Sequence, residues 1–483
     1  MGNMGHLLAT APAMSSPDTS TAFPPTVQHL RQVLLWPLRL MPVAGESAQV
    51  SRHWELLAQM ADSPWREVVD EYTGGKEGFH ERHYNEFVTF LPYVQRFLYG
   101  EGGTTGEPGH GAAMRVFRRR DVAQARVVTR PGEAPLLLDV VHIDLIFFLD
   151  VDVVFLNVEL AANQLPLPLA QEVLYRFGRG YPSGWDADGQ ALHCMASAEW
   201  LDASGQVLAS SDAQQRERFM AHVCEHRAPR IAAHWAFLLH PLVDDRSGHA
   251  SDLRFRQIEY YRMPMMGYLA LNDPRALTRN DFIRLGLVTG AGASTADKGG
   301  ALPYAQEHLA DFEARYCYDR FWNDSGAAPH TRYLCSGHSL VVVGDAQAHF
   351  YTCGDRGVLA QFRHQHFLLF VIAHFQKAAL LMFADRLAEA LRRLDVGHTG
   401  SVRRFKRSIR TCFESFLRFT HRYWFHEVAE QAQARALFNM SARHLGLDPL
   451  YAEVKERIAD MNSYLEADSL RRQANTVVRL TVV

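Results

Sequence analysis

The last quarter of the chain is nearly free of helix-breaking residues. Between Asp355 and Val483 the only proline is Pro449, and the glycines are Gly357, Gly397, Gly400 and Gly446. Proline and glycine disfavour helix interiors but are common at helix ends. This distribution predicts three long helices, at about Asp355–Leu394, Ser401–Met440 and Asp448–Val483. We expect the first two to form an antiparallel pair over residues 355–446 and the third to form a stalk over residues 447–483.

The preceding region, residues 26–354, mixes strand and helix signals. Its Gly/Pro-rich breaks, Gly100–Gly111 and Gly290–Gly300, are typical of loops. Runs rich in Val, Ile, Leu and Phe between Ala113 and Leu160 have strand length, and strand signals recur at 255–271 and 338–343. Helical spacing occurs at 169–180 and 212–239. The sequence therefore predicts an α/β or α+β cytosolic domain, preceded by a mobile tail at residues 1–25.

Composition excludes several classes of protein. The 50 Lys and Arg residues are balanced by 53 Asp and Glu residues, so there is no broad basic surface of the kind that nucleic-acid binders carry. The six cysteines are far apart, without a CxxC pair, which predicts neither a zinc ribbon nor a disulfide framework and favours a reducing compartment. The strongest apolar run, Gln365–Gln376, is shorter than the roughly 20 residues that a membrane helix needs. We expect no bilayer-spanning segment in the chain as given.

A heptad pattern marks the beginning of the third expected helix. Apolar side chains recur at alternating intervals of four and three residues, which is the a/d spacing of helices that pack along their length. These residues are Leu447, Tyr451, Val454, Ile458, Met461 and Leu465. Beyond Leu465 the stripe moves by five residues and resumes as Leu470, Ala474, Val477 and Thr481. The helix is therefore expected to present a different packing face near its end.

The final segment, Asp460–Val483, resembles the stretch that leads into the first transmembrane helix of CorA-type magnesium/cobalt transporters. In that family a segment of the form RQNEVMKxLT precedes the membrane, and Arg472, Gln473, Leu480 and Thr481 match it in register. The order of an α/β domain, antiparallel helices and a stalk is also similar. The N-terminal domain shows no motif that aligns. The family's Gly-Met-Asn signature and both transmembrane helices would lie beyond Val483, so we expect the chain to be the cytosolic part of a longer protein.

The resemblance implies a function and a set of residues. It implies a homo-pentamer at the cytoplasmic face of the cell membrane that conducts Mg²⁺ or a similar divalent cation passively, without enzymatic chemistry, organic cofactor or nucleic-acid partner. Candidate pore-lining residues are Leu470, Ala474, Val477 and Thr481, with Asn475 beside them. Candidate metal-binding carboxylates on the stalk are Asp460, Glu466 and Asp468, although each is also consistent with a solvated helix face. The alternatives are a soluble hydrolase or transferase with its site in the α/β domain, and a helical scaffold protein.

Several motifs bear on the enzymatic alternative. Ser339 follows Gly337-His338, but Val341 replaces the last glycine of a nucleophile elbow, so a serine at the start of a buried strand is favoured. The loop Gly290–Ser294 lacks the third glycine of the dinucleotide fingerprint and the spaced Gly-Lys-Ser/Thr of a phosphate-binding loop, so a flexible loop is favoured. Asp150-Val151-Asp152 has the form of a DxD metal site, yet strand-like flanks favour a hairpin turn.

Histidine pairs and a basic run are also better explained by structure than by a site. His364 and His366 lie on different sides of a helix, as do His421 and His426, and therefore cannot share a metal ion. The run Arg403–Arg407 could face anionic headgroups or phosphates, but a solvated helix face above an aromatic core is favoured.

Overall fold

We describe a computed structural model of the chain. The structure describes residues 25–43, 52–68, 81–100, 113–248, 251–259, 261–291, 302, 304–395 and 397–481, with side chains up to residue 467. The expected tail at residues 1–25 lies outside these ranges except for Pro25. Within them the chain forms one mixed 14-stranded sheet and a set of helices that ends in a long C-terminal helix.

The sheet has the order β12-β13-β14-β11-β1-β6-β5-β4-β7-β8, with β2, β3, β9 and β10 attached to this path. The pairs β11–β14 and β9–β10 are parallel, whereas the other pairs are antiparallel. The strands are β1 Thr26–Leu40, β2 Trp65–Glu67, β3 Met114–Arg119, β4 Gln124–Val128, β5 Leu136–Phe148, β6 Val153–Pro166, β7 Ser197–Leu201, β8 Val207–Ser210, β9 Val243–Asp244, β10 Arg254–Gln257, β11 Met265–Leu271, β12 Cys317–Phe321, β13 Thr331–Ser336 and β14 Ser339–Asp345.

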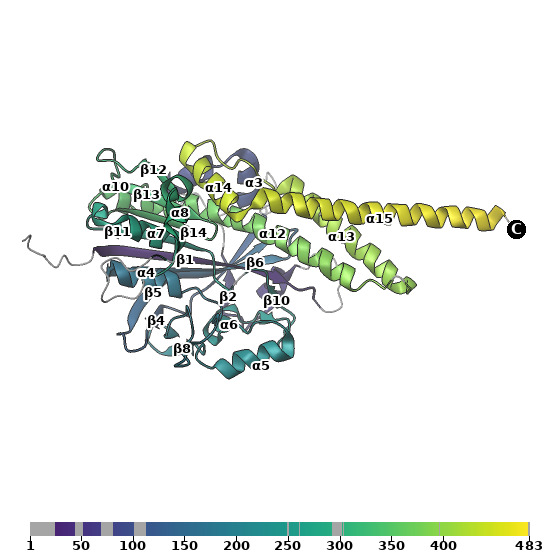
Figure 1. The fold of residues 1–483 in the computed structure, drawn as a ribbon, viewed down its shortest axis with the longest axis horizontal. Coiled ribbons are helices and arrows are strands. Elements are labelled where there is room, and N and C mark those ends of the chain that lie inside the picture. The colour runs from purple at the N-terminus through teal and green to yellow at the C-terminus, as the bar shows by residue number, and fades with distance from the viewer. Residues whose placement is uncertain are drawn as a thin grey trace, which may run out of the picture.

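Helices cover both faces of this sheet. The helices before the C-terminal region are α1 His53–Gln59, α2 Glu81–Thr89, α3 Pro92–Tyr99, α4 Leu167–Arg176, α5 Arg216–His226, α6 Ala233–Leu239, α7 Arg279–Leu287, α8 Gln306–Leu309, α9 Phe312–Tyr316 and α10 His349–Thr352, with a short 3-10 turn at Pro274–Ala276. The C-terminal region contains α11 Val358–Gln361, a π-helical turn at Phe362–His366, α12 Phe367–Arg392, α13 Thr399–Arg422, α14 Ala432–Leu445 and α15 Leu447–Thr481. Figure 1 shows α4, α5 and α6 on one side of the sheet and α12, α14 and α15 on the other.

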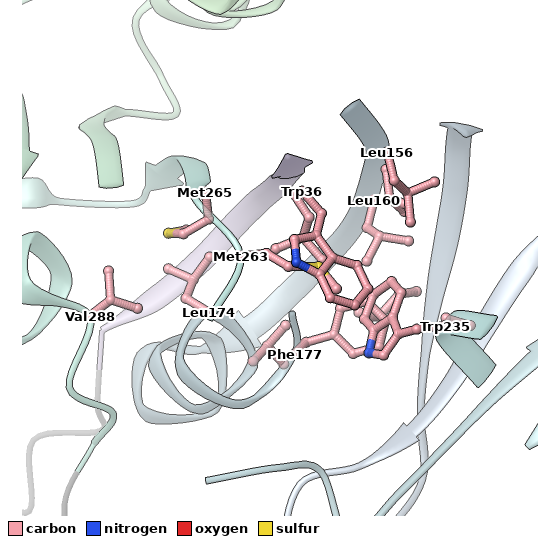
Figure 2. Close-up of a cluster of buried hydrophobic side chains, with 14 of the residues drawn as sticks. Trp36, Leu156, Leu160, Leu174, Phe177, Trp235, Met263, Met265 and Val288 are labelled. Atoms are coloured by element: carbon pink, nitrogen blue, oxygen red, sulfur yellow. The ribbon is translucent and has the colours of Figure 1, made fainter. Parts of the chain in front are cut away.

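Successive side chains of the central strands point to opposite faces of the sheet, and each face has its own hydrophobic core. On β1, Trp36 points toward the core beneath α4 and α6, whereas Leu35 belongs to the core beneath α12. Figure 2 shows the first core, where Trp36 lies near Phe177 and Trp235. The Phe177 and Trp235 rings are 5.4 Å apart, and both side chains are almost completely buried.

The second core surrounds α12, which packs against β1 and β6 and against α13, α14 and α15. Among the described residues, Val358–Arg392 is the one helical stretch long and apolar enough to cross a membrane, and 72% of its most apolar window is buried inside the protein. The apolar helix is therefore longer than the run Gln365–Gln376, and the expectation that this segment is too short to cross a membrane was wrong. Its burial accounts for its composition, because a helix that is covered on all sides is apolar all round.

The expected second long helix, Ser401–Met440, is interrupted between α13 and α14. The chain at 423–431 leaves the helical path, and Gln376 Nε2 donates to the carbonyl oxygens of Tyr423 and Phe425, each at 3.1 Å. Leu91 N donates to Val428 O at 2.9 Å. These tertiary hydrogen bonds and the burial of Phe425 and Val428 replace the intrahelical bonds. In place of the expected pair, residues 355–446 form one continuous helical stretch at Val358–Arg392, followed by the separate helices α13 and α14.

The expectations for the sequence Asp150–Asp152 and for Ser339 agree with the structure. Asp150 lies in the turn between β5 and β6, with a positive φ of 65°, so the DxD sequence is a hairpin tip. Ser339 begins β14 and is buried, and its hydroxyl donates to Gly286 O at 2.8 Å. The six cysteines are free thiols.

Candidate functional site

The C-terminal helix α15 has two structurally different halves. Its 35 residues extend about 52 Å at 1.5 Å per residue. The first half packs on α12, α13 and α14, whereas Figure 1 shows the remainder extending beyond the end of α13. Ile458, which is 2% exposed, is the last fully buried residue of α15 among the residues whose side chains are described.

The heptad stripe forms the contact of the first half, as the sequence predicts. Leu447, Val454 and Ile458 are buried, and Tyr451 stacks on Trp424 at a ring distance of 4.4 Å. Met461 and Leu465 are only partly buried at the edge of this core. The stripe therefore begins inside the protein and continues out of it.

The candidate metal-binding residues do not converge within one chain. Asp460 is exposed, and Glu466 is exposed and accepts a hydrogen bond from Asn462 Nδ2 at 3.0 Å. Asp468 and the candidate pore-lining residues Leu470, Ala474, Asn475, Val477 and Thr481 lie on α15, but their side chains are outside the described part of the structure. In that part no group of three His, Cys, Asp or Glu side chains could hold a metal ion.

A buried carboxylate, Glu159, links the helical region to the sheet. Its Oε1 accepts from Arg31 of β1 at 2.8 Å and from Arg363 of the π-helical turn at 3.0 Å, and its side chain is 3% exposed. Hydrogen bonds to charged groups are stronger than neutral ones, and a buried carboxylate needs such partners. Glu159 therefore fixes the position of the π-helical turn on the sheet.

Charged side chains on the neighbouring strand, β5, continue the row of ion pairs that begins with Arg31, Glu159 and Arg363. Asp144 accepts two hydrogen bonds from Arg118, at 2.6 and 3.1 Å. His142 lies between Asp144 and Glu159, at 3.5 and 3.4 Å, and burial lowers its pKa although both carboxylates oppose the shift. We interpret this row as a structural ion-pair network. The sequence signal that could have indicated it is a pair of polar residues two apart within an apolar strand, at 142/144 and at 157/159.

A cavity of about 820 Å³ in the sheet-containing part of the chain lies between α5, α6 and β9. Apolar side chains dominate it, and His222, His226 and His240 also line it. Ser251, a lining hydroxyl, donates to Pro241 O at 2.8 Å. The size suits a small-molecule site, and the Ser251 hydroxyl donates to a backbone carbonyl rather than to a lining histidine.

The pair His364 and His366 and the basic run lie as expected, whereas the expectation for His421 and His426 was wrong, because α13 ends at Arg422 and His426 lies in the break that follows it. His364 Nδ1 is 3.1 Å from Glu86 Oε2, whereas His366 is buried against Tyr333, so the two rings have different surroundings. Phe405 is buried while Arg403 and Arg404 are exposed, which matches a solvated helix face above an aromatic core. Comparisons of the chain with protein-family models, curated proteins and solved structures found no match.

Proposed function

We propose that this chain is the cytosolic part of a divalent-cation channel of the Mg²⁺ type, in which several copies assemble around an axis and α15 leads toward the membrane. The observation that carries the proposal is the geometry of α15. This helix is fully buried against its own chain up to Ile458, touches the edge of the core up to Leu465 and then continues to Thr481. The resemblance to CorA-type transporters, at Arg472, Gln473, Leu480 and Thr481, falls on the continuing part.

Helix energetics support assembly. In proteins, helices are stabilised mainly by packing an apolar face rather than by intrinsic propensity. The stripe of Met461 and Leu465 is only partly covered by the chain itself. Neighbouring copies would cover it, and the family resemblance implies five of them.

The chemistry of the cation agrees with the absence of a complete metal site among the described side chains of a single chain. Mg²⁺ prefers oxygen ligands and retains several waters, so one or two carboxylates from each copy suffice. In a symmetric ring, Asp460 or Glu466 would recur around the axis and create a region of negative potential. The proposed transport is passive and includes no covalent chemistry.

The transport role is tested with the complete gene. If the reading frame continues past Val483, it is expected to encode two apolar segments with Gly-Met-Asn between them, and the full-length protein should restore Mg²⁺ uptake to a bacterium that lacks its own Mg²⁺ transporters. A stop codon directly after Val483, or full-length protein in the membrane without uptake, would overturn the proposal.

The pore face is tested by cysteine substitution in that full-length protein. We expect a thiol-reactive reagent to block uptake through Val477→Cys but not through Arg479→Cys, because guanidinium rings on the axis would repel a divalent cation. The two variants are matched in position and chemistry. Block at Arg479→Cys alone would show that the opposite face of α15 lines the pore.

Metal sensing is tested with the chain itself by limited proteolysis. A ligand that binds the folded state stabilises it, by about 2.7 kcal/mol at a concentration of about 100 times Kd. Millimolar MgCl₂ is expected to slow cleavage relative to KCl of equal ionic strength, and the double variant Asp460→Asn, Glu466→Gln should weaken this protection. Glu453→Gln, which removes an exposed carboxylate of the same helix, is the matched control. Equal protection in all variants would place the sensing site elsewhere.

A further inference from the structure

A second cavity, of about 280 Å³, lies where the α12 and α13 pair meets the sheet. Its lining includes four arginines, Arg39 of β1, Arg386 and Arg393 near the end of α12, and Arg404 near the start of α13. Two carboxylates, Asp152 and Glu389, also line it. Arginine is the side chain best suited to bind planar or tetrahedral oxyanions, so the charge balance of this cavity decides what it can hold.

Arg39 is the most deeply buried of the four guanidinium groups. Its side chain is 6% exposed, and it pairs with Asp385 and with Glu389, the latter at 3.1 Å. Arg256 also approaches Glu389, at 3.5 Å. Arg39 Nε is buried and has no hydrogen-bond partner among the described residues. A buried donor without a partner costs free energy, which a ligand oxygen could recover.

Arg386 forms the second buried pair, with Asp152. Burial, together with repulsion from Arg39, lowers the pKa of Arg386 to about 10. Asp152 Oδ1 is buried and has no hydrogen-bond partner in the described part of the chain. This acceptor requires a donor, which an oxyanion can supply only if it carries a proton.

Arg393 and Arg404 leave the cavity with excess positive charge. Arg393 pairs with Glu389 at 2.7 Å, but that carboxylate is already shared with Arg39. Arg404 is exposed and has no ion-pair partner within the described ranges. Four guanidinium groups therefore line the cavity with two carboxylates, those of Asp152 and Glu389. Asp385 pairs with Arg39, and Arg256 with Glu389, from outside this lining.

Hydroxyl groups and a helix terminus add further donors. Ser401, Ser408 and Thr411 of α13 line the cavity, and Ser401 lies in the first turn of this 24-residue helix. Ser401 Oγ already donates to Arg393 O at 3.0 Å, so the hydroxyl donors left for a ligand are those of Ser408 and Thr411. The N-terminus of a helix carries a partial positive charge that favours anions. Donors and positive charge thus approach the cavity from both helices and from the sheet.

We propose that this cavity binds a phosphate group, either as inorganic phosphate or as the monoester headgroup of a lipid. Hydrogen phosphate accepts from the arginines and donates its own proton to Asp152, whereas sulfate offers no proton at neutral pH. The bound group would join the α12 and α13 pair to the end of β1. The proposal does not depend on the transport function.

The experiment compares thermal unfolding of the full chain in phosphate, sulfate and chloride at equal ionic strength. Phosphate is expected to raise Tm above the values in sulfate and chloride. Arg404→Gln should lower the phosphate affinity by about tenfold, because one charge-assisted hydrogen bond is lost. Arg403→Gln, which changes the adjacent exposed arginine outside the cavity lining, should retain the phosphate response. Both variants should unfold at the parent temperature in chloride, since both positions are exposed.

Flotation with phosphatidylcholine vesicles, with and without phosphatidic acid, distinguishes the two sources of phosphate. Binding that requires phosphatidic acid and is lost in Arg404→Gln but not in Arg403→Gln identifies the headgroup. A response to inorganic phosphate with no vesicle binding identifies the free ion. The proposal is overturned if neither ligand binds, if sulfate stabilises as much as phosphate, or if the two variants lose the response equally.

Discussion

Replacing Phe375 with alanine is expected to lower the free energy of unfolding by about 3–5 kcal/mol. Phe375 is completely buried on α12, and its ring lies 4.2 Å from that of Phe148 and 5.5 Å from that of Phe97. Truncation removes apolar surface and leaves a cavity between the sheet and the helices. Chemical denaturation of the purified chain measures the loss.

Leu391→Ala is the matched control for this prediction. Leu391 lies on the same helix but is 53% exposed, so its truncation should change stability by no more than about 0.5 kcal/mol. This comparison also tests the position of α12, which has the length and composition of a membrane span. Similar small effects of the two substitutions would contradict the burial of α12 in the core of the domain.

Acidification is expected to unfold the protein through three buried histidines. Burial lowers the pKa of His234 and of His374 to about 3 and that of His366 to about 4. The unfolded chain binds these protons near pH 6.5, so stability is complete above about pH 6.5 and falls as the pH decreases toward the folded pKa values. At about pH 5 each histidine should cost about 2 kcal/mol, which is on the order of 6 kcal/mol together. Denaturant midpoints measured from pH 7 to pH 4.5 test this.

His374→Leu isolates one of these contributions. Neither ring nitrogen of His374 has a hydrogen-bond partner among the described residues, and leucine has a similar volume. This variant should retain about 2 kcal/mol more of its stability at about pH 5 than the parent. Phe370→Leu is the control, because it disturbs the neighbouring ring, 4.3 Å from His374, without removing a titrating group. Identical pH profiles of His374→Leu and the parent would show that His374 is not the group responsible.

The long C-terminal helices were predictable because the sequence patterns that indicate them involve residues close together in the chain. The spacing from Leu447 to Leu465 identifies the packed face of α15, and the scarcity of proline and glycine predicts α12 and α13. The break at 423–431 was missed, since no proline or glycine marks it. Its cause is the hydrogen bonding of Gln376, about fifty residues earlier in the chain, which no local pattern contains.

The central strand β1 was missed for a similar reason. Pro37 lies within it, and proline normally argues against an interior strand. On one side β1 pairs with β11 up to Leu34 and with β10 from Leu38, so Pro37 lies where the strand changes neighbour and needs no N–H there. The sequence shows the proline, whereas the gap that tolerates it exists only in the assembled sheet.

By itself, the sequence of this protein determined the mixed content of helix and strand, the approximate positions of α12, α13 and α15, and the apolar face of α15. Periodicity and turn residues suffice for that, because they act within a few neighbouring residues. Only the tertiary structure decided what each face packs against, including the cavity formed by Arg39, Asp152, Arg386 and Arg404. The physical reason is that burial and ion pairing depend on distance in space, and these residues are separated by up to several hundred positions along the chain.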